Sequence, residues 1–200
     1  MRNILLAAAG AVLAASTAHA QVSDNRGWMV NAHVAGASTG GAAEDAEMRR
    51  GGALGLAVGY GFSDRLALLV SADGGRVKYP GPVIADAGPS GSYDQVTVDI
   101  ALRASFLDEH SPLRPYLTSG ITGVAESSRL DSTGIVTSGG GITIGGGVQY
   151  FTSPKVALEA GLLFTAGSFT GFEVEGEKYE YDEGLGFGHS RLQLGITWHP

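Results

Sequence analysis

Six ionisable residues are the first candidates for chemistry, because each lies in a stretch that is otherwise apolar or rich in glycine. Carboxylates and guanidinium groups in such surroundings must pair with one another or line a polar path. The strand pattern described below places Glu159 and Arg191 on neighbouring strands. It places Asp99 and Arg103 on the inward face of one strand, separated by one other inward position. We therefore expect an interior network of ion pairs, made of Arg65, Asp73, Asp99, Arg103, Glu159 and Arg191.

A second group of carboxylates lies near the end of the chain, in the segment FEVEGEKYEYDE from Phe172 to Glu183. Its acids are Glu173, Glu175, Glu177, Glu180, Asp182 and Glu183. The period of two in this segment predicts a hairpin that gathers the carboxylates. Clustered oxygens suit a divalent cation or a basic partner. The spacing matches no dedicated calcium loop, so a solvated loop is the simpler interpretation.

Two histidines raise the question of a nucleophile and its base. His189 and Ser190 are adjacent, but adjacent residues of a strand point to opposite faces, so they cannot form a hydrogen-bonded catalytic pair. His33 with a serine of a loop is the other combination, although a lone inward histidine is more often a packed polar residue. The glycine triplets at 139–141 and 145–147 precede no helix and do not form a phosphate loop. We expect neither enzyme activity nor a cofactor.

The elements that position these residues are β-strands. From Gly52 to Phe62, large apolar residues alternate with glycine and alanine, and the alternation resumes after Ser63-Asp64, from Leu66 to Asp73. A period of two on both sides of a tight turn predicts a β-hairpin. The face that a soluble hairpin would show to water is mostly glycine and alanine with occasional charges. We therefore interpret the apolar face as facing lipid.

The same alternation predicts eight strands, and no charged residue falls on their apolar face. Charge in contact with lipid costs about 2 to 4 kcal/mol at the midplane. Long connections (38–50, 74–92, 125–139 and 167–186) alternate with short ones, as in an antiparallel up-and-down transmembrane β-barrel with both termini in the periplasm. Aromatic residues near the short turns predict a periplasmic girdle, made of Trp28, Tyr60, Phe62, Phe106, Tyr150 and Trp198.

The beginning of the chain predicts export. Residues 1–20 carry Arg2, an apolar run and the small-x-small sequence Ala18-His19-Ala20, which indicates a cleaved signal peptide before a barrel domain at 21–200. Cysteine is absent, so the exported domain must be stable without disulfides. A formal net charge of −7 with no basic stripe argues against nucleic acid as a partner.

The stretches GLAVGYGFSDRLAL, RPYLTSGITGVA and RLQLGITW resemble strands and turns of the small eight-stranded outer-membrane β-barrels of Gram-negative bacteria, the OmpA/OmpX type or porin family. The resemblance covers the whole mature chain. It implies a monomer in the outer membrane that contacts outer-membrane lipids and lipopolysaccharide and is inserted by the outer-membrane insertion machinery. The family usually ends on an aromatic residue, whereas here His199-Pro200 follow Trp198.

Eight strands enclose an interior that side chains can just fill. We therefore expect a filled lumen and a structural or surface-interaction role through the extracellular loops. A narrow, low-conductance pore for small solutes or ions is the alternative, because inward glycines leave space; they are Gly51, Gly55, Gly59, Gly141, Gly145 and Gly147. A lipid-modifying outer-membrane enzyme and a soluble lipocalin-like binder are less favoured. The lipocalin would display a face rich in glycine and poor in charge to water.

Overall fold

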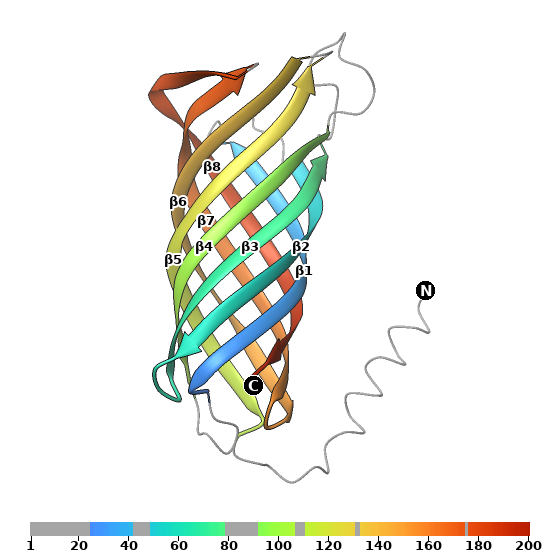
Figure 1. Ribbon diagram of the computed structural model, residues 1–200, viewed down its shortest axis with the longest axis vertical. Helices are drawn as coiled ribbons and strands as arrows, with labels where there is room; N and C mark the ends of the chain where they lie inside the picture. The colour runs from blue at the N-terminus through green and yellow to red at the C-terminus, as the bar shows by residue number, and fades with distance from the viewer. Residues whose placement is uncertain (1–24, 42–48, 79–91, 107–110, 131–132, 175) are drawn as a thin grey trace, which may run out of the picture.

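The computed structural model describes residues 25–41, 49–78, 92–106, 111–130, 133–174 and 176–200. Within these residues eight antiparallel strands form a closed barrel, in which each strand pairs with its sequence neighbours and β1 pairs with β8 (Figure 1). This confirms the predicted fold class. The strands are β1 Gly27–Gly41, β2 Arg49–Gly61, β3 Leu66–Lys78, β4 Ser92–Ser105, β5 Leu113–Leu130, β6 Thr133–Ser153, β7 Val156–Val174 and β8 Glu177–Trp198. The described residues include no helix that is long and apolar enough to cross a membrane.

The alternation along each strand sets the two faces of the wall, as predicted. On β4, Val98 and Ile100 are about half exposed, while Thr97 and Asp99 are buried. On β2, Leu54 is 70% exposed although it is a large aliphatic residue. The outside of the barrel is thus the apolar side, and the inside carries the polar groups.

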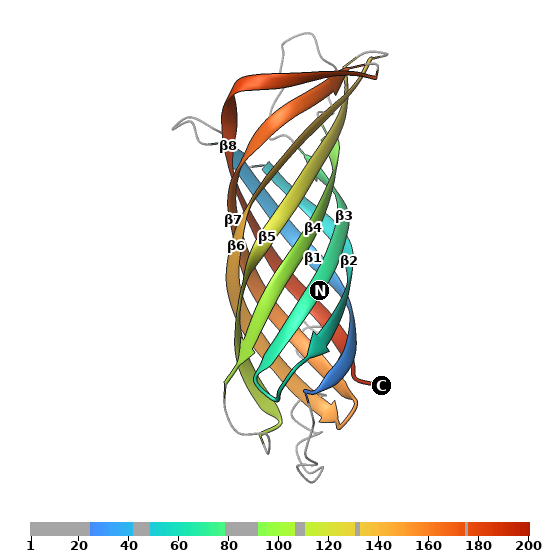
Figure 2. The same cartoon turned by 60° about the vertical axis from the view of Figure 1, so that its left-hand side comes forward.

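All four expected loops contain more strand than the sequence predicts, since β1 continues to Gly41 and β3 to Lys78, and the difference is largest in the last two. Residues 125–139 and 167–186 were expected to be loops, but β5 continues to Leu130 and β7 to Val174. That prediction was wrong because both segments lack proline and their residues keep pairing across the two strands. The hairpin predicted within 172–183 is confirmed. It bends at a register shift between Phe169 and Gly171 (Figure 1), and Figure 2 shows it lying across the upper end of the barrel.

The opposite end of the barrel carries short turns. At the β2–β3 turn, Ser63 Oγ accepts hydrogen bonds from the amides of Arg65 and Leu66, and β3 begins only at Leu66. Arg65 is therefore exposed in the turn, and its predicted place in the interior was wrong. The turn extends one residue beyond Asp64, so the alternation begins after Arg65.

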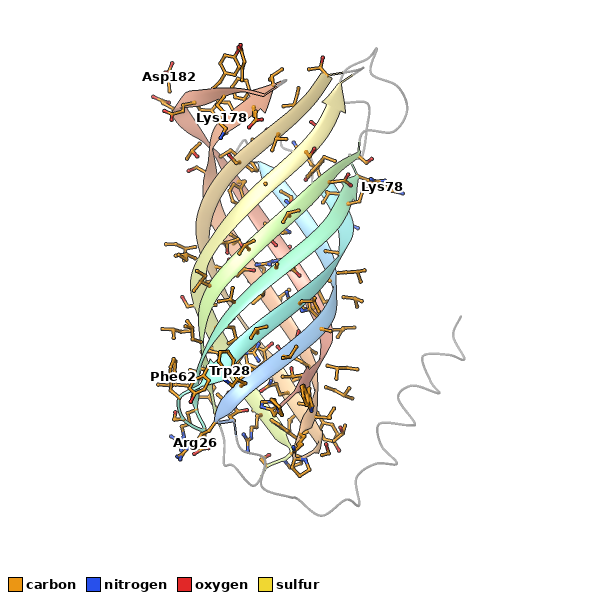
Figure 3. All side chains as sticks on the ribbon, in the orientation of Figure 1. Arg26, Trp28, Phe62, Lys78, Lys178 and Asp182 are labelled. Carbon is orange, nitrogen blue, oxygen red and sulfur yellow. The ribbon has the colours of Figure 1, made fainter. Side chains whose placement is uncertain are left out.

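Aromatic residues gather at this same end. Trp28 lies edge-on to Tyr60 with ring centroids 5.4 Å apart, and Tyr60 lies edge-on to Phe62 at 5.6 Å. Figure 3 shows Trp28 and Phe62 on the outside of the wall near the turns. Phe106 and Trp198 are also about half exposed, whereas Tyr150 is partly buried. These are the surroundings in which rings sit between lipid and water.

Candidate functional site

The interior of the barrel holds two layers of buried ionic groups. The lower layer, on the side of the short turns, is centred on Glu159 of β7. The upper layer, on the side of the long hairpins, is centred on Arg191 of β8. Both residues are at most 9% exposed, so neither charge is solvated by bulk water. Buried charges persist only when they are paired and hydrogen-bonded.

In the lower layer, the carboxylate of Glu159 receives hydrogen bonds from five side chains, one of them Asn31 of β1 at 3.4 Å. Arg103 of β4 donates from both terminal nitrogens, at 2.6 and 3.1 Å. Tyr116 of β5 donates its hydroxyl at 2.8 Å, and its ring lies 4.0 Å from the Arg103 guanidinium carbon. Gln149 of β6 donates at 3.1 Å and Thr197 of β8 at 2.8 Å. Five strands therefore converge on one carboxylate.

In the upper layer, one guanidinium bridges two carboxylates. Arg191 Nη1 lies 2.8 Å from Asp73 Oδ2 and 2.7 Å from Asp99 Oδ2, and Nη2 lies 2.8 Å from Asp99 Oδ1. Thr97 lies 3.2 Å from the same Nη1, and Thr122 donates to Asp99. Asp73 and Asp99 come from β3 and β4, so the bridge spans the lumen from β8 to the far wall.

His33 of β1 connects the two layers. Its Nε2 lies 2.6 Å from Asp73 Oδ1, and its Nδ1 lies 2.7 Å from the side-chain amide oxygen Oδ1 of Asn31. Asn31 in turn donates to Thr197 at 2.9 Å and to Glu159 at 3.4 Å. The two layers hold three carboxylates and two guanidinium groups, and His33 supplies the third positive charge when it is protonated.

The space that inward glycines leave is occupied by larger side chains. A Cβ atom at Gly55 would collide with His33 and Asp73, and one at Gly147 or Gly161 would collide with the Tyr116 hydroxyl. A cavity of about 50 Å³ remains between the layers, which has room for a few water molecules at most. These glycines therefore accommodate the network and do not leave a channel at those positions.

The two ends of the lumen are also filled. On the side of the short turns, Arg114 is 1% exposed and its guanidinium carbon lies 4.8 Å from the Phe151 ring centroid. On the side of the long hairpins, Val77, Tyr93 and Phe187 are each at most 5% exposed. A path through the barrel would have to pass both ends and both ionic layers.

The structure brings together five of the six predicted network residues, but with other partners. Glu159 and Arg191 were expected to pair with each other, whereas Glu159 pairs with Arg103 and Arg191 pairs with Asp73 and Asp99. The register explains the difference, because Glu159 stands opposite Gly195, four residues along β8 from Arg191. The expected relation between Asp99 and Arg103 is likewise replaced by these pairs.

Sequence reasoning missed the neutral members of the network. Tyr116, Gln149 and Thr197 all bind Glu159, yet nothing in their types marks them as ligands of a carboxylate. Only their position could have identified them as partners of Glu159, since each occupies an inward position of a predicted strand next to the charged positions. His33 was identified as an inward histidine, and its contacts are those of a packed polar residue.

The predicted acidic loop forms the tip of the β7–β8 hairpin. Glu177, Glu180, Asp182 and Glu183 are exposed and Glu173 is partly buried, while Glu175 lies outside the described residues. Lys178 stands opposite Glu173 in the ladder, and Figure 3 shows Lys178 and Asp182 on the hairpin above the barrel. The described part of the chain contains no group of three or more His, Cys, Asp or Glu that could hold a metal ion.

The remaining candidate pair does not meet. His189 is 4% exposed and faces the lumen. Ser190 stands opposite Phe164, whose ring is half exposed on the outside of the wall. The two side chains therefore lie on opposite faces of β8, as the alternation predicts.

Comparisons with known proteins agree with this architecture. Neisserial surface protein A of Neisseria matches with a TM-score of 0.62 and 19% identity, over 86% of this chain and 96% of that chain. The outer membrane protein OprG of Pseudomonas aeruginosa matches with a TM-score of 0.54 and 12% identity, over 88% and 97%. Ail, the attachment invasion locus protein of Yersinia pestis, gives 0.52 and 14%, over 86% and 99%. At such identities the likeness shows the fold alone.

Sequence comparison identifies the family. A search of curated proteins found no match. A model of the outer membrane protein beta-barrel domain, in contrast, matches residues 5–194, which is nearly the whole chain. The apolar outer face and the closed sheet on which this family depends are both present. The chain therefore belongs to the outer membrane protein beta-barrel domain family and lies in the bacterial outer membrane.

Proposed function

We propose that this barrel is closed to ions and solutes and that its role is structural and interactive at the cell surface. The observation that carries the proposal is the double ionic layer across the lumen. Arg191 of β8 binds Asp73 and Asp99 on the opposite wall, and in the lower layer Arg103 and Tyr116 both bind Glu159. Opening a path would leave several of these charges unpaired in a medium of low dielectric constant, which is costly.

The hairpins support the interactive part of the proposal. On β7–β8, Phe172 stacks on Tyr179 with ring centroids 5.2 Å apart and lies 5.2 Å from Tyr181. A groove of about 600 Å³ lies between these rings and β6, with the carboxylates of Glu173 and Glu180 and the single cation of Lys178 on its wall. Aromatic faces beside carboxylates suit a lysine- or arginine-rich segment of a partner.

The same geometry supports a non-enzymatic role. Among the described residues, the inward-facing His33 and His189 are not hydrogen-bonded to a serine hydroxyl. His33 is occupied by Asp73 and Asn31. A nucleophile needs a base within hydrogen-bond reach, so we propose that the chain does not catalyse hydrolysis or acyl transfer.

Conductance of the refolded chain in a planar lipid bilayer tests closure. We expect no steady conductance from the unmodified chain. Arg191→Ala removes the bridge between Asp73 and Asp99, and it should produce brief openings. Lys178→Ala, on the exposed hairpin, is the control and should remain silent. Large, stable channels from the unmodified chain would show that the lumen conducts, and the narrow-pore alternative would replace this proposal.

Binding of a lysine-rich peptide tests the surface role. The peptide should bind the refolded chain more weakly as salt increases, because the attraction comes from exposed carboxylates. A Glu177→Gln, Glu180→Gln, Asp182→Asn variant should lose this binding, whereas Lys155→Ala in the β6–β7 turn should keep it. Equal binding by all three proteins would contradict a role for the hairpin.

A further inference from the structure

A group of cations lies on the outside of the barrel, where the proposed function makes no use of it. Arg76 and Lys78 flank Val77 on β3, and Val77 is buried inside at 2% exposure, so both cations face outward. The ladder places Arg50 of β2 opposite Lys78 and Gly52 opposite Arg76. We call Arg50, Arg76 and Lys78 the basic patch. Figure 3 shows Lys78 pointing away from the barrel wall.

The basic patch is only partly neutralised. Arg76 binds Asp94 of β4 through Nε at 2.7 Å and Nη2 at 3.1 Å. Neither Arg50 nor Lys78 has an ion-pair partner within the part of the chain that the structure describes. Like charges directly opposite each other on neighbouring strands repel. An anion placed between Arg50 and Lys78 would remove that repulsion.

The height of the basic patch places it at the membrane surface. The outward face of β3 is apolar or glycine from Leu66 to Gly74 and becomes charged at Arg76. From Leu66 to Arg76 the strand climbs about 25 Å, at about 3.3 Å per residue and a tilt of about 40°. The apolar band of such barrels is also about 25 Å tall. Because Leu66 follows a short turn, Arg76 lies at the level of the lipid headgroups on the hairpin side.

An apolar hollow lies directly beneath the basic patch. It is shallow and open to the outside, and it has a volume of about 730 Å³. It is lined by Val34, Leu54 and Val96, with Gly52 and Gly74 on its floor and the paired Arg76 and Asp94 on its rim. A Cβ atom at Gly74 would meet nothing within 4 Å. The absence of side chains at these glycines therefore creates open space on the lipid side of the wall and does not serve strand packing there.

We propose that the basic patch and the hollow form one binding site for a phosphorylated lipid of the outer leaflet. Its phosphate lies between Arg50 and Lys78, and an acyl chain lies in the hollow below. The basic patch matches the phosphorylated headgroup of such a lipid, and the apolar hollow matches its acyl chain. The two parts of the site meet at the depth where headgroup and acyl chain meet. Each Lys or Arg near a membrane surface attracts an anionic headgroup.

Titration of fluorescent lipopolysaccharide into the refolded chain in detergent micelles tests the site. Removing one cation should weaken binding about fivefold, so Arg50→Ala with Lys78→Ala should weaken it about 25-fold. Arg65→Ala with Lys155→Ala changes the net charge equally, at the end of the short turns, and should bind like the unmodified chain. If both double variants bound lipopolysaccharide equally well, the proposal would be overturned. Arg50 and Lys78 would then be neutralised by other groups of the chain and would not attract the lipid.

Three further arms identify the ligand. Dephosphorylated lipopolysaccharide should bind as weakly to the unmodified chain as the intact lipid binds to the patch variant. Gly74→Phe fills the hollow and should weaken lipid binding with the patch intact. Inorganic phosphate at millimolar concentration should not displace the lipid. Undiminished binding of the dephosphorylated lipid or by Gly74→Phe, or full displacement by phosphate, would overturn the assignment. A gel shift between heated and unheated samples verifies that each variant is folded.

Discussion

Glu159 in the lumen and Glu180 on the β7–β8 hairpin are the same side chain in opposite surroundings. Glu159 is 9% exposed and receives hydrogen bonds from five side chains of five different strands. Glu180 is exposed to water. A buried carboxylate stabilises the fold only while all its partners are present, whereas a solvated one is nearly independent of its neighbours. The number of acids in a segment therefore says little about what those acids do.

Arg191→Ala is expected to have the largest effect on this contrast. It leaves Asp73 and Asp99 buried without their common partner, which should lower the free energy of unfolding by about 3 to 5 kcal/mol. Urea unfolding of the chain refolded in phospholipid vesicles measures the difference. Lys178→Ala on the hairpin is the matched loss of one cation and should cost less than about 0.5 kcal/mol. Similar losses for both variants would show that burial does not separate the two regions.

The Arg103–Glu159 pair provides a sharper test by a double-mutant cycle. Either Arg103→Met or Glu159→Leu leaves a buried charge alone and should cost about 3 kcal/mol. The double variant removes both charges and should cost clearly less than the two single variants together. Additive losses would mean that the two groups do not interact, and the lower layer would lose its basis. The same urea titration gives all four values.

Tyr116→Phe tests one hydrogen bond to a buried charge. The ring beside Arg103 is kept, but the hydroxyl that donates to Glu159 at 2.8 Å is lost, which should cost about 1.5 to 3 kcal/mol. Tyr179→Phe on the hairpin is the control, because its hydroxyl donates to the exposed Glu177 at 2.9 Å. That change should lie within about 0.5 kcal/mol of zero. An equal effect at both tyrosines would contradict the comparison.

The smallest effect is expected for the acids of the hairpin. Glu180→Gln and Asp182→Asn remove exposed charges, and each should change stability by less than about 0.5 kcal/mol. Thermal unfolding followed by circular dichroism should therefore give unchanged midpoints. A loss of 2 kcal/mol or more would show that these carboxylates have structural partners.

The faces of the strands could be predicted from the sequence because a period of two requires no knowledge of partners. Val96, Val98 and Ile100 alternate with polar residues, and only one orientation keeps charge out of lipid. The pairing inside could not be predicted in this way. It depends on the register between β7 and β8, which sets Glu159 opposite Gly195 and Arg191 opposite Leu163. Sequence patterns leave that register open.

Two errors have a common physical cause. Arg65 was placed in the interior and residues 125–139 were placed in a loop, because alternation alone does not show where pairing starts or stops. The Ser63 hydroxyl accepts hydrogen bonds from the amides of Arg65 and Leu66, so the turn includes Arg65. Beyond Val124 the strands leave the apolar band, so the lipid-facing pattern ends although the ladder continues to Leu130. Backbone pairing between β5 and β6 therefore continues beyond the segment in which apolar, lipid-facing residues alternate with inward ones.

Thiol labelling of the cavity between the two ionic layers tests the closed lumen most directly. The chain contains no cysteine, so Ala57→Cys places a single thiol at the wall of this cavity. In the barrel refolded in vesicles, a small charged thiol reagent should leave this cysteine unmodified until the chain is unfolded, whereas Glu180→Cys on the hairpin should react at once. Rapid labelling of the cysteine at position 57 in the folded barrel would contradict the account, because water and ions would then reach the space between the layers.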